Sequence, residues 1–185
     1  NLSVGVSLTG EQVAALTHDI VWMEQHEVAG QKVLVPVLYM AQANNRLAPN
    51  GALITGNDVS LISGQSLNNS GTLRATNNLG VSAGGNLTNA GLIEAGNLLK
   101  LRATNNLTNT AGGVIAGRNV DLVAVNGDLL NERSVTTHDS DSGYRTERTQ
   151  FVNSAARIEA ADTLTMQAGR DVNNIGSVIK SGGDT

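Results

Sequence analysis

Apolar residues recur along this chain at a spacing of about twenty residues, beginning after residue 50. Gly51, Gly71 and Gly91 each open a copy of the same pattern. Within a copy the apolar residues fall at even offsets from the opening residue, which is the period of a β-strand and excludes the period near 3.6 of a helical repeat. We therefore predict a β-solenoid, in which each copy forms one coil and stacked coils bury a shared core.

The aligned copies give six columns of mostly apolar residues, which we expect to face the core in three short strands per coil. The first strand supplies Leu53 and Thr55, Leu73 and Ala75, Ile93 and Ala95, Val114 and Ala116, and Ile158 and Ala160. The second strand supplies columns that begin with Val59, Leu61 and Ser63 and end with Leu164, Met166 and Ala168. The third strand supplies Leu67, Leu87, Leu107, Leu129 and Val172.

Turn-forming residues separate the strands, and one polar column follows the third strand. Pairs such as Gly56-Asn57 and Gly96-Asn97 close corners easily, because glycine and asparagine tolerate positive φ. The polar column consists of Asn69, Asn89, Asn109, Asn131 and Asn174. Stacked amides can hydrogen-bond from coil to coil, so we interpret this column as a structural ladder, with a ligand site as the alternative.

Residues 1–50 do not follow the repeat. Thr9 and Gln12 match a capping box, and the apolar spacing that follows predicts a short helix over about residues 10–18. Two apolar runs, residues 20–28 and 32–40, are separated by Ala29-Gly30 and predict a β-hairpin. The first fifty residues therefore predict a helix and a hairpin that pack on the solenoid or cap it.

Two roles for this hairpin remain open. It covers the solenoid and buries Trp22, Val35 and Tyr39 against the coils, or its apolar surface docks a partner or a membrane, for which Trp22 and Tyr39 are the candidate contacts. Strands of about nine residues are also the length that membrane barrels use. Pro36 cannot donate to a neighbouring strand, so we expect a free edge there. The apolar run at residues 33–41 is too short for a membrane-spanning helix.

A polar and charged insertion interrupts the repeat at residues 133–155. Residues 135–137 and 144–152 favour strands and residues 139–143 favour a turn, so we predict a hairpin that projects from the coil wall. Insertions of this kind often serve binding, and the candidate contacts are Tyr144, Arg145, Arg148 and Phe151. The alternative is a solvated decoration that shields strand edges. The predicted organisation is a segment 1–50, coils 51–132, the insertion 133–155 and coils 156–185.

Composition agrees with this architecture. The chain has 185 residues, of which 40% are hydrophobic and 15% charged, so it is able to bury a sizeable core. Only 2% of the residues are aromatic, and all of these lie outside the aligned coils, as expected for a narrow bore. The absence of cysteine excludes disulfides and thiolate metal sites. A net charge of −4 without a basic stripe gives no reason to expect nucleic acid as a partner.

The columns also argue against catalysis. Glycan-active β-helix enzymes stack carboxylates on adjacent coils to bind calcium or to divide acid and base work. Here the column that begins with Asp58 continues with other residue types: Asn78, Leu98 and Asn119. No serine lies in a nucleophile elbow. We therefore predict no enzyme activity and no cofactor, and keep a glycan-active enzyme as the third and weakest alternative.

The histidines and the N-glycosylation motifs do not indicate a functional site. His138, Asp139 and Asp141 resemble a small metal cluster, but they lie in a predicted turn without a fourth ligand, so we predict no metal site. His18 and His26 have no partner close in sequence. The N-glycosylation pattern occurs at three asparagines, Asn68, Asn86 and Asn106. The repeat itself generates two of these matches, so we treat them as coincidental.

The copies that begin at Gly71 and Gly91, with the sequences GTLRATNNLGVSAGGNLTN and GLIEAGN, resemble filamentous haemagglutinin repeats of two-partner-secretion exoproteins. The preceding segments LTHDIVWMEQ and KVLVPVLY, which start at Leu16 and Lys32, are similar to a segment found before such repeats in the contact-dependent growth inhibition (CdiA) family. The resemblance covers essentially the whole chain.

This resemblance implies a right-handed parallel β-helix, exported from a Gram-negative bacterium through an outer-membrane partner transporter and displayed on the cell surface. It implies contact with a target-cell surface or outer membrane through the full-length protein. We expect this chain to be a piece of such a protein that holds neither the export signal nor the toxin, and to form a monomeric, non-catalytic rod segment of roughly 25 to 30 Å. A toxin-delivery filament and an adhesin both fit, and the rival is a receptor-, glycan- or membrane-binding module.

Overall fold

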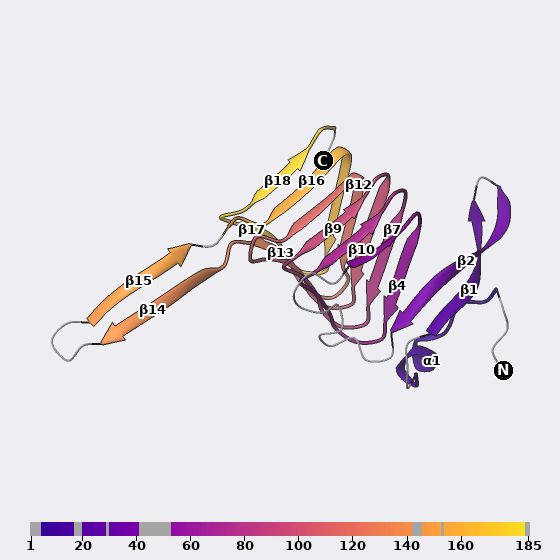
Figure 1. Cartoon of the computed structure of the whole chain (residues 1–185), viewed down its shortest axis with the longest axis horizontal. Coiled ribbons are helices and arrows are strands. Elements are labelled where there is room, and N and C mark those ends of the chain that lie inside the picture. The colour runs from indigo at the N-terminus through magenta and orange to yellow at the C-terminus, as the bar shows by residue number, and fades with distance from the viewer. Residues whose placement is uncertain are drawn as a thin grey trace.

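The computed structural model describes residues 5–16, 20–28, 30–40, 53–141, 146–152 and 154–183. The described chain is a parallel β-solenoid of about five turns with roughly 21 residues per turn, accompanied by one short helix and an N-terminal antiparallel hairpin (Figure 1). A second hairpin projects from the opposite end of the molecule (Figure 1). The predicted all-β solenoid is therefore confirmed.

Each coil supplies three strands, and each strand pairs in parallel with its equivalents in the neighbouring coils. The first column contains β3 (Leu53–Gly56), β6 (Thr72–Ala75), β9 (Leu92–Ala95) and β18 (Val178–Ser181). The second contains β4 (Val59–Ser63), β7 (Leu79–Ala83) and β10 (Leu98–Ala103). β12 (Val114–Ala124) and β16 (Arg157–Ala168) run through both columns and join them into one 11-stranded sheet.

The third column forms a separate 5-stranded sheet. Its members are β5 (Leu67–Asn69), β8 (Leu87–Asn89), β11 (Leu107–Asn109), β13 (Leu129–Glu132) and β17 (Val172–Ile175). The two sheets enclose a core of stacked aliphatic side chains, among which Leu67, Leu79, Leu99, Leu107, Ile115 and Leu122 are at most 1% exposed. The alternation of buried and exposed residues along these strands is the period of two that the sequence predicts.

The register of the first coil differs from the expected alignment. Ile54, and not Leu53, is the partner of Leu73, and Leu53 is 60% exposed. Thr55 likewise pairs with Arg74 instead of joining the inward column. Side chains alternate between faces, so a slip of one residue moves a whole strand's inward set to the outside. The expected core positions Leu53 and Thr55 were therefore wrong.

The fourth coil shows a second register difference. Ile115 instead of Val114 aligns with the core residue Ile93, and Gly117 instead of Ala116 aligns with Ala160. A turn in which Ala111 has φ 53° and Gly112 has φ 78° precedes this strand and lengthens the coil. The register shifts again between Gly117 and Asn119, which restores the predicted alignment of the second strand.

The final coil does not bury its third strand. Val172, which was expected to face the core, is 45% exposed, and Ile175 is 56% exposed. β17 pairs with β13 on one side, and no strand among the described residues pairs with its other side. Among the described residues, no further coil therefore covers the side chains of β17.

Glycine corners let successive coils approach each other closely, and one substitution tests this. Gly96→Ala is expected to lower the free energy of unfolding by about 1 to 3 kcal/mol, because the new Cβ would lie 2.0 Å from the backbone oxygen of Thr76 in the preceding coil. Gly80→Ala is the matched control, since its Cβ meets nothing closer than Ser60 Oγ at 4.0 Å. Urea unfolding of both variants checks the expectation, and equal midpoints would contradict it.

The N-terminal helix α1 spans Gly10–Ala14 and is shorter than predicted. The capping box is confirmed: the Gln12 backbone N–H donates to Thr9 Oγ1 (3.3 Å), and the Thr9 N–H donates to Gln12 Oε1 (2.8 Å). Residues 17–19, at the end of the predicted helix, lie outside the described residues. No helix in the described part of the chain has the length and apolar character needed to cross a bilayer.

The hairpin consists of β1 (Ile20–Val28) and β2 (Gln31–Met40), which pair antiparallel along their full length. β2 also pairs in parallel with β4, but only from Leu38 to Met40, so the hairpin extends the solenoid sheet at one end. Pro36 lies before this paired segment. The predicted free edge at Pro36 is thus present in the structure.

The insertion forms a second hairpin, with β14 (Val135–Asp141) antiparallel to β15 (Thr146–Val152). These strands form a 2-stranded sheet of their own and project away from the coils (Figure 1). The first strand is longer than predicted, because β14 continues through Asp141, where the sequence favoured a turn. Residues 142–145 lie outside the described residues.

Candidate functional site

The asparagine column forms a continuous hydrogen-bonded ladder. The Nδ2 of each asparagine donates to the Oδ1 of the next. The four distances, in chain order, are 2.9, 2.9, 3.0 and 2.8 Å for the steps Asn69 to Asn89, Asn89 to Asn109, Asn109 to Asn131 and Asn131 to Asn174. The first four of these residues are at most 2% exposed. The ladder thus lies inside the wall of the solenoid.

Asn109 shows how completely the ladder uses each amide. Its Nδ2 donates to Asn131 Oδ1, to the Gly113 carbonyl and to the Arg157 carbonyl, each at 3.0 Å, and its Oδ1 accepts from Asn89. No described buried side-chain nitrogen or oxygen is without a hydrogen-bond partner. The amides therefore join three coils and leave no group free to bind a ligand.

A second polar column, at the corner immediately before the third strand of each coil, was not recognised in the sequence. The oxygen of each side chain accepts the backbone N–H of the following coil: Asn106 N–H to Asn86 Oδ1 (3.1 Å), Asp128 N–H to Asn106 Oδ1 (2.9 Å) and Asp171 N–H to Asp128 Oδ1 (3.2 Å). The recurrence of Asn or Asp at this offset was the available signal. Asn86 and Asn106, which match the glycosylation pattern, are thus part of the coil-to-coil bonding.

Asp58 also stabilises a turn through its side chain. Its Oδ1 accepts from Asn77 Nδ2 (3.0 Å) and from the Asn78 backbone N–H (3.2 Å) in the next coil. Asn78 Oδ1 repeats the arrangement by accepting from Leu98 N–H (3.2 Å). A single carboxylate at the start of this column therefore stabilises a corner, and the column contains no stacked acids.

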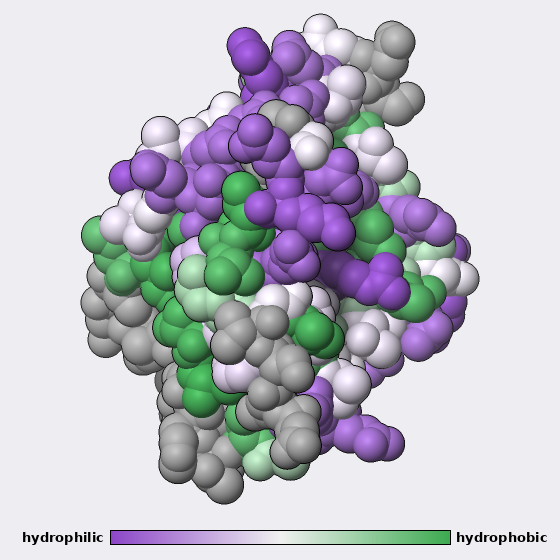
Figure 2. Space-filling view, turned by 90° about the vertical axis from the view of Figure 1, so that its right-hand side faces the viewer, coloured by the Kyte–Doolittle hydropathy of each residue, from purple (hydrophilic) through white to green (hydrophobic). Residues whose placement is uncertain are grey.

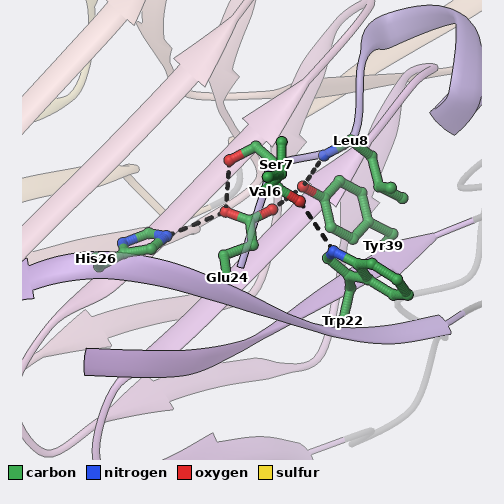
Figure 3. A network of polar contacts seen from close by, with 7 residues as sticks. All are labelled: Val6, Ser7, Leu8, Trp22, Glu24, His26 and Tyr39. Atoms are coloured by element: carbon green, nitrogen blue, oxygen red, sulfur yellow. Dashed lines mark hydrogen bonds and ion pairs between the residues drawn. The ribbon is translucent and has the colours of Figure 1, made fainter. Parts of the chain in front are cut away.

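A buried carboxylate organises the N-terminal hairpin (Figure 3). Glu24 is 3% exposed. Its carboxylate accepts from the Tyr39 hydroxyl and from Ser7 Oγ (2.9 Å), and it lies 3.0 Å from His26 Nε2. The expectation that His26 has no partner close in sequence was wrong, because residues two apart on one strand share a face.

Residues 5–16, which we call the lid, are held on the hairpin by further bonds. Gly5 exchanges backbone hydrogen bonds with β1 at Met23 and Gln25 (2.9 Å each). The Leu8 N–H donates to the Tyr39 hydroxyl (3.1 Å), and Trp22 Nε1 donates to the Val6 carbonyl (2.9 Å; Figure 3). The lid is therefore fixed through both its backbone and the polar network.

The lid covers a second, smaller core. Its buried members are Val13, Val37 and Tyr39, and its partly buried members are Leu8, Leu16, Ile20, Trp22, Val35 and Ile62. The sequence placed Trp22, Val35 and Tyr39 against the coils. Only Ile62 in this cluster comes from a coil, because Leu38 and Met40 point to the bore and the alternate residues point outward. The hairpin thus extends the solenoid through its backbone, while its aromatic face belongs to the lid.

Burial and hydrogen bonding together set the pKa values of Glu24 and Tyr39. Burial raises the pKa of Glu24, but hydrogen bonds from Tyr39, His26 and Ser7 outweigh it, so this pKa lies below its ordinary value. Burial, followed by the adjacent Glu24 carboxylate, raises the pKa of Tyr39 to about 12. The structure therefore favours an ionised glutamate beside a neutral tyrosine.

Acidification is expected to loosen the lid. A carboxyl whose pKa is lowered by folding contributes stability above its unfolded value of 4.5, and this contribution is lost as the pH falls through the folded value. The contribution of Tyr39 is complete below pH 10.0 and is lost as the pH rises towards 12. Fluorescence of Trp22, the single tryptophan, reports on the lid during both titrations.

Glu24→Gln is the control for this titration. The variant is expected to bind the lid about 1 to 2 kcal/mol more weakly at pH 7 and to lose the acid transition of Trp22 fluorescence. A transition of the same size and midpoint in both proteins would assign it to other carboxyls and contradict the role of Glu24.

The other face of the hairpin is apolar and exposed. Val21 is 65% exposed, Leu34 52% and Met23 39%. Seen from the hairpin end, the surface of the molecule has apolar residues lying among polar ones (Figure 2). Trp22 and Tyr39, the aromatic candidates for contact, lie on the opposite face beneath the lid. If the hairpin binds a partner, the accessible apolar residues are Val21, Met23 and Leu34.

The described strands of the insertion, β14 and β15, do not lie near the N-terminal candidates Trp22 and Tyr39 (Figure 1). The two hairpins lie at opposite ends of the molecule (Figure 1). Tyr144 and Arg145 lie outside the described residues, and of Arg148 and Phe151 only the backbone pairing, with Asp139 and Thr136, is described. The side chains of the residues that resembled a metal cluster, His138, Asp139 and Asp141, are likewise outside the description. In the part that is described, no three His, Cys, Asp or Glu residues could hold a metal ion.

Comparisons with known proteins agree on one family. A family model described as "Haemagglutinin repeat" matches residues 38–185. The chain is 42% identical over 99% of its length to a protein named "Deoxyribonuclease CdiA" from Dickeya dadantii. It is 36% identical over its whole length to "tRNA nuclease CdiA-2" from Burkholderia pseudomallei, and 34% identical over 98% to "Toxin CdiA" from Escherichia coli.

The chain corresponds to a small part of each of these relatives. It spans 6% of the length of all three. No solved structure matches the chain significantly.

Proposed function

The chain belongs to the haemagglutinin repeat family, as a segment homologous to part of the CdiA toxins, and we propose from this premise that it is a non-catalytic structural segment of a cell-surface toxin-delivery filament. Such a filament is exported through an outer-membrane two-partner-secretion transporter and reaches a target cell by contact. The contribution of this segment is mechanical, since it adds rigid length between the parts that act.

The observation that carries this proposal is the unbroken bonding from coil to coil. Parallel backbone pairing joins neighbouring coils through the strand columns, and the asparagine ladder runs from Asn69 to Asn174. About five turns at ~4.8 Å each give a rod of about 24 Å. A rod of this kind needs only a sealed core and satisfied corners, and the described residues supply both.

The names of the relatives support a non-catalytic role. One relative is named a deoxyribonuclease and another a tRNA nuclease, and both align with essentially the entire chain. Because proteins with different named activities share this segment, we do not expect the segment to contain the residues that give each protein its own activity. We therefore assign the chain no part in nucleic-acid cleavage.

Removal of the inserted hairpin tests the mechanical role against the rival role of a receptor-binding module. Val135 and Val152 are register partners, so deletion of residues 136–151 leaves two chain ends that are already close together. In the full-length exoprotein, expressed with its transporter, the deletion is expected to leave surface display and target-cell binding within about twofold of wild type.

Target-cell binding that is lost while surface display is retained would assign the insertion to recognition and contradict a purely mechanical role. A triple change of the exposed hairpin residues, Val21→Ser, Met23→Ser and Leu34→Ser, makes the equivalent test at the other end. These side chains are exposed, so little stability should be lost.

A further inference from the structure

A trench crosses the outer face of the solenoid sheet where the hairpin meets the coils. Two hollows of about 350 and 540 Å³ adjoin at Ser60 and Gly80, which line both of them. The floor is formed by outward residues of β4 and β7 together with the turns before them, from Asn57 to Ile62 and from Asn77 to Ser82. Five to six residues of strand correspond to a length of roughly 17 Å.

The hollow follows from the sequence of the floor and the path of β2. Ser60, Gly80 and Ser82 are small, so the sheet surface lies low between the hairpin and β10. β2 pairs with β4 only from Leu38 onwards, and the strand therefore departs from β4 at Pro36, which lines the trench. One wall is thus the diverging hairpin, and the other is the outer face of β10.

Charge is distributed unequally along the trench. Lys100 and Arg102, exposed on β10, line one end together with the partly buried Asp121. None of these three groups takes part in an ion pair within the described part of the chain. Glu27 and Asp58 line the other end, beside the hairpin. The trench is therefore positive over β10 and negative beside the hairpin.

We propose that this trench binds an extended peptide segment of a partner protein, with acidic side chains over Lys100 and Arg102 and a basic side chain beside Glu27 and Asp58. Carboxylates form strong hydrogen bonds with lysine and arginine, and the reverse pairing applies at the hairpin end. Between the ends, the Ser60 and Ser82 hydroxyls face the occupant, and Val35 and Pro36 offer apolar contact. The proposal goes beyond the filament role, which does not depend on it.

The composition of the trench distinguishes a peptide from other occupants. Among the described residues that line it, His26 alone carries an aromatic ring, and its Nε2 already lies 3.0 Å from the Glu24 carboxylate. Extended nucleic acids are usually held by stacking on several aromatic rings. β7 pairs with strands on both sides along the floor, whereas β4 pairs with β2 only from Leu61 to Ser63, so within the described residues the hairpin-side edge of β4 is open at Val59 and Ser60 alone. Recognition therefore comes mainly from side chains and from the charge at the two ends.

Gly80→Val supplies a test that fills the trench and spares the fold. A Cβ at Gly80 meets nothing closer than Ser60 Oγ at 4.0 Å, so a larger side chain has room, and that room is the trench. Thr165→Val, at an exposed position on β16 outside the trench, is the matched control. Equal unfolding midpoints of both variants and wild type verify that the fold is intact.

The probes are two fluorescein-labelled hexapeptides of one composition, Lys-Ser-Val-Ser-Glu-Glu and its reverse, with binding to the 185-residue chain measured by anisotropy. We expect one of the two orders to bind, with at least tenfold weaker binding to Gly80→Val and to the double variant Lys100→Glu, Arg102→Glu. Thr165→Val and Lys180→Glu are expected to bind as wild type does. A peptide with lysines in place of the glutamates is expected to bind the double variant better than wild type.

Two results would overturn the proposal. The first is no binding of either hexapeptide, and the second is equal binding to wild type and Gly80→Val. A sulfated oligosaccharide is tested in parallel: if both peptides fail and the oligosaccharide binds wild type but not Gly80→Val, the occupant is a glycan. Each of these results leaves the coil stacking and the filament role unaffected.

Discussion

Asn109→Asp is expected to lower the free energy of unfolding by about 3 to 5 kcal/mol, which is a large part of the stability of a domain of this size. The substitution changes one atom of a fully buried side chain and leaves its shape unchanged. It removes both N–H donors at the place where three acceptors converge. The effect is therefore one of hydrogen bonding and charge, without a cavity.

The expected loss of stability follows from the hydrogen bonds that the neighbours of Asn109 would lose in the variant and from the charge that it would bury. The carbonyls of Gly113 and Arg157 lose this donor, and the Gly113 carbonyl keeps the Arg157 backbone N–H (2.9 Å). Each lost hydrogen bond costs about 0.5 to 1.5 kcal/mol, and the buried, unpaired charge supplies the larger part of the loss. The new carboxylate would also lie against Asn131 Oδ1, which is itself an acceptor and currently 3.0 Å from the donor that is removed. Protonation of the aspartate recovers part of the loss, so the stability deficit relative to wild type should be smallest at low pH.

Asn105→Asp is the matched control, since Asn105 is an exposed asparagine in the turn before the same strand. It is expected to shift the free energy of unfolding by less than about 0.5 kcal/mol. Urea unfolding followed by circular dichroism measures both variants. Similar midpoints for the two would show that the ladder contributes little and would remove the physical basis of the rod.

The repeat explains why much of the fold was predictable. In a stacked solenoid every inward position recurs in each coil, so the columns that contain Leu79, Leu101 and Leu107 identify themselves by repetition. The asparagine ladder was found by the same reasoning, since Asn69 and Asn109 occupy one corner in different coils. The periodicity of the sequence therefore predicts both the core residues and the asparagine ladder.

The register differences arise where a turn changes length by a residue. Leu53 and Val114 are apolar and lie at the expected offset, but neither faces the core. A neighbouring apolar residue, Ile54 or Ile115, takes the inward position in each case. Two adjacent apolar residues fit either register, and the sequence alone does not show which turn absorbs the difference.

The lid and the Glu24 network were missed for a different reason. Ser7, Glu24 and Tyr39 are separated by long stretches of chain and occur once, so no repetition reveals their contact. One signal was present: Glu24 lies on the same strand face as Ile20 and Trp22, and a carboxylate on an apolar face needs donors nearby. That observation would have predicted a polar partner, although not which one.

The filament role is tested most directly by two deletions in the full-length exoprotein, expressed with its transporter. Leu79 and Leu99 are register partners, so deletion of residues 80–99 removes one complete coil and joins equivalent positions. Deletion of residues 80–89 removes half a coil and joins positions from different columns. Both deletions remove Asn89, so they differ in register and not in the loss of a ladder residue.

The measurement is growth inhibition of target cells, with surface display quantified in parallel. The complete-coil deletion is expected to retain display and inhibition within about twofold of wild type, because Asn69 then stacks directly on Asn109. The half-coil deletion is expected to lose both by at least tenfold, because inward residues of one column meet outward residues of another. Normal display with lost inhibition in the complete-coil deletion would contradict the role of a rigid segment and place a specific function in the coils themselves.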